Sequence, residues 1–86
     1  MKFIFFSSYY NGCDVLEDYT PFEADSMDNA EYALLEVKEY NSTNPDKTKE
    51  FCGMEILSND WRFSCKILTL DEWFDGNKRA MHVVYK

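Results

Sequence analysis

Large apolar or aromatic side chains occupy seven of the first ten positions, and this pattern predicts a strand at residues 2–9. The segment is rich in aromatic residues, which favour strands, and it is followed by Asn11-Gly12, a dipeptide typical of tight turns. A second short strand is expected around residues 19–24, where it can pair with the first. Pro21 then requires an edge or irregular position, because proline has no N–H to donate.

The spacing of apolar residues changes after Asp25 and predicts a helix at residues 26–40. At 100° per residue, six apolar side chains fall on one stripe. They are Met27, Ala30, Ala33, Leu34, Val37 and Tyr40. Asp25 or Ser26 can cap the first N–H groups. The polar segment 41–45 ends in proline and is expected to stop the helix.

The second half of the chain is predicted to form a hairpin followed by short elements. Residues 51–57 and 61–70 flank the polar stretch 58–60, and each has the composition of a strand. Residues 69–72 fit a capping box and predict a single helical turn, although the same residues can instead extend the strand into a second hairpin. Residues 80–85 are expected to form the last strand.

These elements predict one domain, residues 1–86, of the α+β class. Eighty-six residues are too few for two independent cores. The expected order is β-β-α-β-β-β, with a small antiparallel sheet of four to five strands packed on one main α-helix.

Charge is distributed unevenly along this chain. Sixteen Asp and Glu residues against nine Lys and Arg residues give a net charge of -7, and all of that excess lies in residues 1–40. A field of this sign repels phosphate backbones and acidic lipids, which argues against direct binding to nucleic acid or membranes. We therefore expect the partner to be a basic protein surface.

The helix face opposite the apolar stripe has the composition of a binding patch. Tyr32 and Leu35 should lie there among carboxylates, unless a loop such as residues 11–20 covers them. The predicted partner-binding residues are Asp14, Glu17, Asp18, Asp28, Glu31, Tyr32, Leu35, Glu36 and Glu39. The alternative interpretation is that these acidic residues form a solvated surface that keeps an aromatic-rich domain soluble.

No residue pattern favours catalysis, a metal or a cofactor. His82 is the only histidine and has no nucleophile motif near it, and Cys13, Cys52 and Cys65 lack the spacing of zinc sites. We therefore expect a protein that is not an enzyme. Cys52 and Cys65 lie on consecutive predicted strands and can form a disulfide, although free thiols are favoured. Three cysteines and no signal-like segment favour a cytoplasmic location.

Two segments carry a resemblance to a known class of proteins. Residues 1–4, Met-Lys-Phe-Ile, open a compact acidic domain, and residues 70–76 are similar to an L-x-x-W-F-x-G stretch in an anti-CRISPR protein. The chain thus resembles the small bacteriophage-encoded inhibitors of host defence, which include anti-CRISPR and DNA-mimic proteins. The resemblance implies carboxylates that imitate phosphates and occupy a nucleic-acid-binding surface of a host nuclease, restriction factor or polymerase, in the host cytoplasm.

Two functional hypotheses follow. The first is an inhibitor or regulator that docks a basic, nucleic-acid-handling host protein such as a CRISPR or restriction nuclease. The second is a structural or assembly protein that self-associates, for example as a homodimer, through edge strands at residues 2–9 and 80–85.

Overall fold

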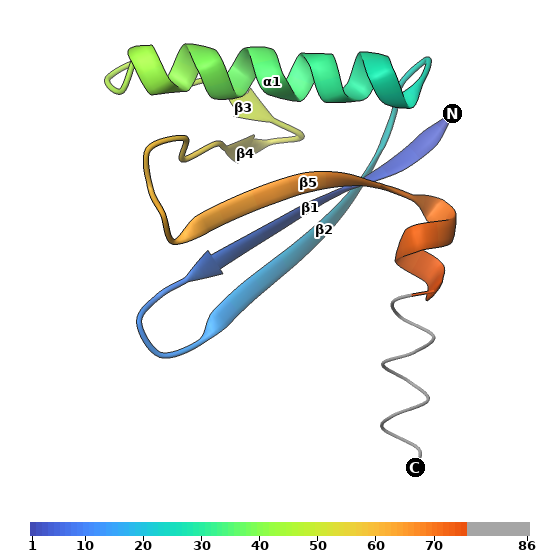
Figure 1. Cartoon of the computed structure of the whole chain (residues 1–86), viewed down its shortest axis with the longest axis horizontal. Helices are drawn as coiled ribbons and strands as arrows, with labels where there is room; N and C mark the ends of the chain where they lie inside the picture. Colours follow the sequence, from blue (N-terminus) through green and yellow to red (C-terminus); the bar gives the residue numbers. More distant parts are fainter. Residues whose placement is uncertain (76–86) are drawn as a thin grey trace.

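The computed structural model describes residues 1–75 and has the predicted α+β architecture (Figure 1). Five strands and one long helix have defined bounds within this part of the chain. They are β1 (Lys2–Tyr10), β2 (Val15–Glu23), α1 (Met27–Thr43), β3 (Glu50–Phe51), β4 (Met54–Glu55) and β5 (Phe63–Thr69). Residues 70–75 are helical.

The strands form a three-stranded antiparallel sheet and a separate two-stranded one. The larger sheet has the order β2-β1-β5, with Phe5 of β1 opposite Thr20 on one side and Ile67 on the other. Because β1 is paired on both sides, the prediction that residues 2–9 form an edge strand available for a dimer is wrong. Within residues 1–75, the strands form this three-plus-two arrangement in place of the predicted single sheet of four to five strands.

The predicted hairpin between residues 51–57 and 61–70 is also wrong, because β5 pairs with β1. The local hairpin instead joins β3 to β4 through Cys52 and Gly53, whose φ angles are 54° and 80°. Glycine tolerates this left-handed region without the steric cost of a Cβ atom. The connection to β5 continues from residue 56 and includes the polar residues 58–60.

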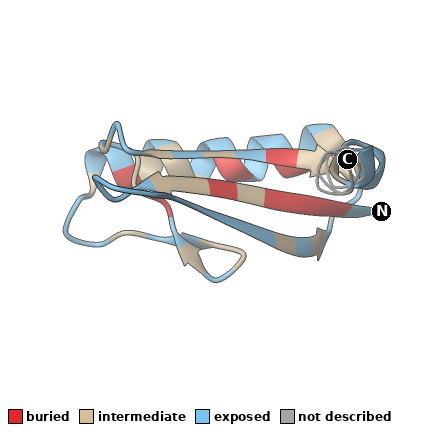
Figure 2. Ribbon diagram, turned by 90° about the horizontal axis from the view of Figure 1, so that it is seen from below, coloured by how far each residue is buried: buried red, intermediate tan, exposed pale blue. Residues whose placement is uncertain are grey.

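The main core lies where one face of the sheet meets α1 and the β3–β4 hairpin (Figure 2). Alternation along β1 turns Phe3 and Phe5 toward this core. The buried cluster consists of Phe3, Phe5, Ala30, Leu34, Ile56 and Ile67. The ring of Phe51, from the β3–β4 hairpin, packs against this core, with its centroid 5.0 Å from that of Phe5.

Helix α1 begins one residue later than predicted and ends three residues later. The Ser26 hydroxyl accepts a hydrogen bond from the Asn29 N–H at 3.1 Å, which identifies Ser26 as the N-cap among the two candidates. At the other end, the N–H of Asn44 donates to the Tyr40 carbonyl at 2.9 Å. The helix therefore continues to Thr43 before Pro45 prevents further helical hydrogen bonding.

The buried stripe of α1 differs from the predicted one at two positions. Ala33 is exposed, so its assignment to the core stripe is wrong, and Asn41 is buried instead. The Asn41 side chain donates to the carbonyls of Lys49 and Ile56, both at 2.9 Å, and accepts from the Lys49 N–H at 2.7 Å. These bonds connect the C-terminal end of α1 to Lys49, which precedes β3, and to Ile56, which follows β4.

The capping box before residues 70–75 is confirmed. The Thr69 N–H donates to Oε1 of Glu72 and the Glu72 N–H donates to Oγ1 of Thr69, both at 3.1 Å. A helical segment thus follows β5, and the alternative of an extended strand is wrong. The strand predicted at residues 80–85 and His82 lie outside the described residues.

Candidate functional site

The outer face of α1 presents apolar side chains among carboxylates. Tyr32 is 64% exposed and Leu35 is 49% exposed, so the loop at residues 11–20 does not cover them. Four acidic residues of the same helix are also exposed. They are Asp28, Glu31, Glu36 and Glu39. We call these six residues the α1 face.

The structure places the nine predicted site residues in two groups rather than one. Asp14 precedes β2, and Glu17 and Asp18 lie on it, whereas the other six form the α1 face. Strand β2 is one edge of the large sheet, and α1 packs beside β5 at the other edge and against β3 (Figure 1). The acidic residues of the two groups therefore do not form one continuous patch.

We call Asp14, Glu17 and Asp18 the β2 group. Its members are separated further because successive side chains of a strand point to opposite faces of the sheet. Glu17 and Asp18 are neighbours and so point to opposite faces of the sheet. The Asp18 carboxylate accepts a hydrogen bond from the Tyr19 N–H at 2.9 Å. Burial raises the pKa of the Tyr19 hydroxyl, and the nearby Glu17 carboxylate adds to that rise. The Tyr19 ring also packs on Phe6, 5.1 Å between centroids.

Lysine and arginine residues do not neutralise the α1 face within the described part of the chain. The one salt bridge among residues 1–75 joins Arg62 to Asp60 at 2.9 Å. This pairing lowers the pKa of the Asp60 carboxyl through its hydrogen bonds with Arg62. Lys49 lies over the ring of Tyr40, 4.2 Å from its centroid. The carboxylates of the α1 face are therefore left without a described ion-pair partner.

A groove runs beside the α1 face, between the helix and β5. It consists of two hollows of about 410 and 340 Å³ that share Lys38 and Cys65, and we call it the α1–β5 groove. Glu31 and Leu35 line one hollow and Glu39 lines the other, so three residues of the α1 face also border the groove. The apolar lining comes mainly from Leu34, Leu35, Ile56, Leu57, Phe63 and Ile67.

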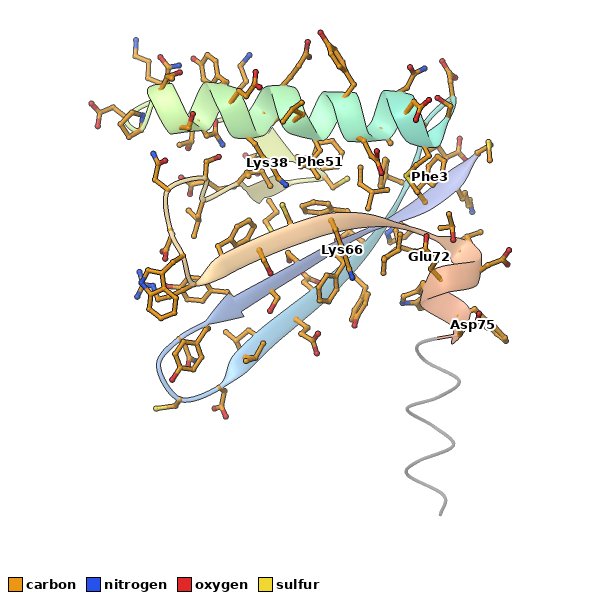
Figure 3. All side chains as sticks on the ribbon, viewed as in Figure 1. Phe3, Lys38, Phe51, Lys66, Glu72 and Asp75 are labelled. Atoms are coloured by element: carbon orange, nitrogen blue, oxygen red, sulfur yellow. The ribbon has the colours of Figure 1, made fainter. Side chains whose placement is uncertain are left out.

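Lys38 and Cys65 meet at the centre of this groove. Figure 3 shows Lys38 on the side of α1 that faces β5. Burial raises the pKa of the Cys65 thiol, and the nearby Lys38 ammonium partly opposes this rise. The thiol is therefore held in its protonated, weakly nucleophilic form.

Sequence reasoning identified the exposed rim of this groove but not its floor. Lys38 could have been found from its spacing, because it follows Leu34 by four residues and so lies beside the apolar stripe. Cys65 and Ile56 carry no such signal. They reach the groove only through the pairing of β5 with β1 and the packing of the small hairpin.

The cysteines and acidic residues do not build a metal centre in the described region. Cys13, Cys52 and Cys65 are free, and residues 1–75 contain no group of three or more His, Cys, Asp or Glu side chains placed to hold a metal ion. The possible Cys52–Cys65 disulfide is therefore not formed. No helix in this region combines the length and apolar character required to cross a membrane.

Comparison of the chain with protein-family models, with curated proteins and with solved structures gave no match.

Proposed function

We propose that this chain is a non-enzymatic protein-binding module that docks a basic surface of another protein through the α1 face. The observation that carries the proposal is the exposure of Tyr32 and Leu35 among four carboxylates of one helix. Its target is a nucleic-acid-handling protein, and the module acts as an inhibitor by covering the surface that would otherwise hold phosphates. The resemblance to phage-encoded inhibitors makes a CRISPR or restriction nuclease in a bacterial cytoplasm the first target class to test.

The two kinds of side chain on the α1 face have different physical roles. Tyr32 and Leu35 offer apolar area that is removed from water on docking and slows dissociation. The carboxylates attract a basic surface and speed the encounter, and salt screens this effect. The helix holds both kinds of group in a fixed spacing, so little ordering is required when the partner binds.

The separate β2 group has a smaller role in this proposal. Asp14, Glu17 and Asp18 lie at the other edge of the sheet from α1, so a flat partner surface seated on α1 does not touch them. Their charges contribute only to the long-range field, which decays over about 8 Å at physiological salt.

A pull-down from bacterial lysate tests the proposal, with the immobilised chain washed at about 50 mM and about 500 mM salt. We expect basic nucleic-acid-handling proteins to be retained at low salt and released at high salt. Leu35→Ala should reduce retention. Leu16→Ala on β2 is the matched control, because Leu16 is similarly exposed, at 57%, but lies outside the α1 face. Equal effects of the two substitutions, or no basic protein retained, would contradict the proposal.

Self-association through aromatic side chains is the second candidate function. The observation that favours it is the 82% exposure of Trp61, whose ring lies 6.1 Å from that of the exposed Tyr10. Light scattering on wild-type protein and on Trp61→Ser separates the candidates. A stable oligomer that Trp61→Ser dissociates would favour the assembly role, and a monomer would leave the docking proposal as the better account.

A further inference from the structure

The face of the large sheet that turns away from the core carries aromatic side chains. Because side chains alternate along a strand, β1 directs Phe3 to the core, and Phe6 and Tyr10 to the opposite face, which we call the outer face. Strand β2 adds Tyr19, which lies opposite Phe6 in the β1–β2 register. Helix α1 and the β3–β4 hairpin both pack on the core side, so within residues 1–75 they leave the outer face uncovered.

Two aromatic pairs lie on the outer face. The ring centroids of Phe6 and Tyr19 are 5.1 Å apart, and those of Tyr10 and Trp61 are 6.1 Å apart. Tyr10, Tyr19 and Trp61 are all exposed. Phe6 and Tyr10 are four residues apart on β1, so about 14 Å separates the two pairs along the strand. A ligand that lies along β1 can therefore contact both pairs.

The pair at Phe6 borders a hollow of about 290 Å³. Tyr19 of β2 and Lys66 of β5 line its two sides, and Glu72 lines it as well. Hydrogen bonds with Thr69 lower the pKa of the Glu72 carboxyl, and the Lys66 ammonium lowers it further. The positive charge of Lys66 is therefore offset by Glu72, and the hollow has an aromatic lining that suits a compact apolar group.

The outer face between the two pairs has small side chains and a negative charge. Ser8 follows Phe6 by two residues, with Glu17 and Ser64 opposite it on the neighbouring strands. Burial raises the pKa of the Tyr19 hydroxyl and the Glu17 carboxylate raises it further, as expected for two side chains on the same face. The one salt bridge within residues 1–75 does not involve Glu17. This position therefore favours a basic residue in a ligand.

A proline-rich segment suits such a surface. The backbone N–H and C=O groups of a sheet lie in its plane, so its face offers a ligand side-chain contacts only. Proline has no N–H that would lose its hydrogen bond to water, and a proline-rich segment is already extended before it binds, so aromatic-lined surfaces bind it at low entropic cost. In polyproline II each residue advances about 3.1 Å, so two Pro-Pro pairs with centres four residues apart lie about 12 Å apart. This spacing is close to that of the two aromatic pairs.

We infer that the outer face binds a proline-rich segment of another protein, in the polyproline II conformation and along β1. One Pro-Pro pair fills the hollow beside Phe6 and Tyr19, and the other packs on Tyr10 and Trp61. A basic residue between them faces Glu17. Single-stranded nucleic acid also stacks on aromatic rings, but Glu17 and the net charge of -7 repel its phosphates. The outer face lies apart from the α1 face, so the inference goes beyond docking on α1 and does not depend on it.

A defined peptide tests this inference, namely acetyl-Ala-Pro-Pro-Ala-Lys-Pro-Pro-Ala-amide. A control peptide with its four prolines replaced by alanine keeps the length and the charge but loses the pyrrolidine rings and the preformed conformation. Both are titrated into the ¹⁵N-labelled full chain. We expect the proline peptide to shift the amides of Ser8 and Tyr10 and the indole N–H of Trp61, with a dissociation constant on the order of 1 mM or below. The alanine peptide should bind at least about fivefold more weakly.

Two substitutions on opposite faces of the sheet provide the matched comparison. Trp61→Ala removes a ring of the outer face, whereas Leu16→Ala removes an exposed side chain that lies opposite Tyr9 on the core side of the sheet. We expect Trp61→Ala to weaken binding of the proline peptide at least about fivefold, and Leu16→Ala to leave it unchanged. Because Trp61 is 82% exposed, its replacement leaves the core intact. If Trp61→Ala nevertheless fails to fold, the alanine peptide decides the question without a variant.

The outcomes separate this inference from the proposed function. Equal binding of the two peptides, shifts confined to the α1 face, or no binding at about 5 mM peptide would each overturn it. Tighter binding of a short oligothymidine than of the proline peptide would assign the outer face to single-stranded nucleic acid and overturn it as well. Concentration-dependent shifts of Ser8 and Trp61 in the free chain would assign the face to a second copy, with the same consequence. Docking on α1 is tested separately by the lysate pull-down, so these results leave it intact.

Discussion

Replacing Asn41 by alanine should destabilise the fold by about 2 to 3 kcal/mol. Asn41 is 3% exposed, and its side chain makes three hydrogen bonds to the backbone of Lys49 and Ile56. Each bond contributes about 1 kcal/mol. The Ile56 carbonyl still accepts a hydrogen bond from the Ser58 N–H at 3.1 Å, so its loss of Asn41 adds no penalty for an unpaired group. Alanine has the better helix propensity, but that gain is at most about 0.7 kcal/mol. The loss of hydrogen bonds therefore dominates.

Urea denaturation followed by far-ultraviolet circular dichroism measures this loss. A domain of this length has a total stability of roughly 4 to 13 kcal/mol, so Asn41→Ala removes a large share of it. At a slope near 1 kcal/mol/M, the midpoint should fall by about 2 to 3 M urea. Ser42→Ala is the control, because Ser42 is exposed and its change should stay within about 0.5 kcal/mol. Equal midpoints for the two variants would refute the role assigned to Asn41.

Three further predictions concern the ends of the helices and the thiols. Ser26→Ala removes the N-cap of α1 and should lower the unfolding free energy by about 1 kcal/mol in the same urea assay, and an unchanged midpoint would contradict the cap. Hydrogen bonds from Thr69 lower the pKa of the Glu72 carboxyl, so its contribution to stability is present above the unfolded pKa and is lost as pH falls through the folded one. Glu72→Gln should therefore flatten the acid side of the melting-temperature profile below about pH 4.5, and an unaltered profile would argue against this linkage. Exposed Cys13 should react with a thiol reagent at pH 8 faster than Cys65, whose pKa burial raises, and mass spectrometry of the labelled peptides checks the order.

Features specified by nearby residues were predictable from the sequence. The apolar spacing located α1, Ser26 was among the two expected caps, and the Thr69–Glu72 capping box forms as predicted. The exposure of Tyr32 and Leu35 followed from the same helical geometry. In each case the interacting residues are three or four positions apart, so the pattern contains the necessary information.

Features that depend on distant residues were not predictable in this way. Residues 61–70 look like the partner of the preceding segment, yet β5 pairs with β1, about sixty residues earlier. That pairing places β5 beside α1 and makes β1 a central strand. It also separates the β2 group of carboxylates from α1. A local pattern cannot reveal which strands are neighbours, because several registers bury the same apolar faces.

Asn41 shows a second way in which prediction from the sequence failed. Its position at the end of the helix suggested a polar stop signal, whereas its side chain replaces missing strand hydrogen bonds for Lys49 and Ile56. Buried polar side chains are retained where backbone groups would otherwise lack partners. Which backbone groups lack partners becomes known only once the hairpin has been placed.

The most direct test of docking on the α1 face is the association rate with the basic protein that the pull-down retains. Surface plasmon resonance on Glu36→Gln and Glu17→Gln, at about 50 to 500 mM salt, compares one carboxylate of the α1 face with one of the β2 group. We expect Glu36→Gln to lower the association rate about two- to threefold at low salt and to reduce its salt dependence, with Glu17→Gln close to wild type. Equal effects of both substitutions, or an effect of Glu17→Gln alone, would contradict the assignment of the docking surface to α1.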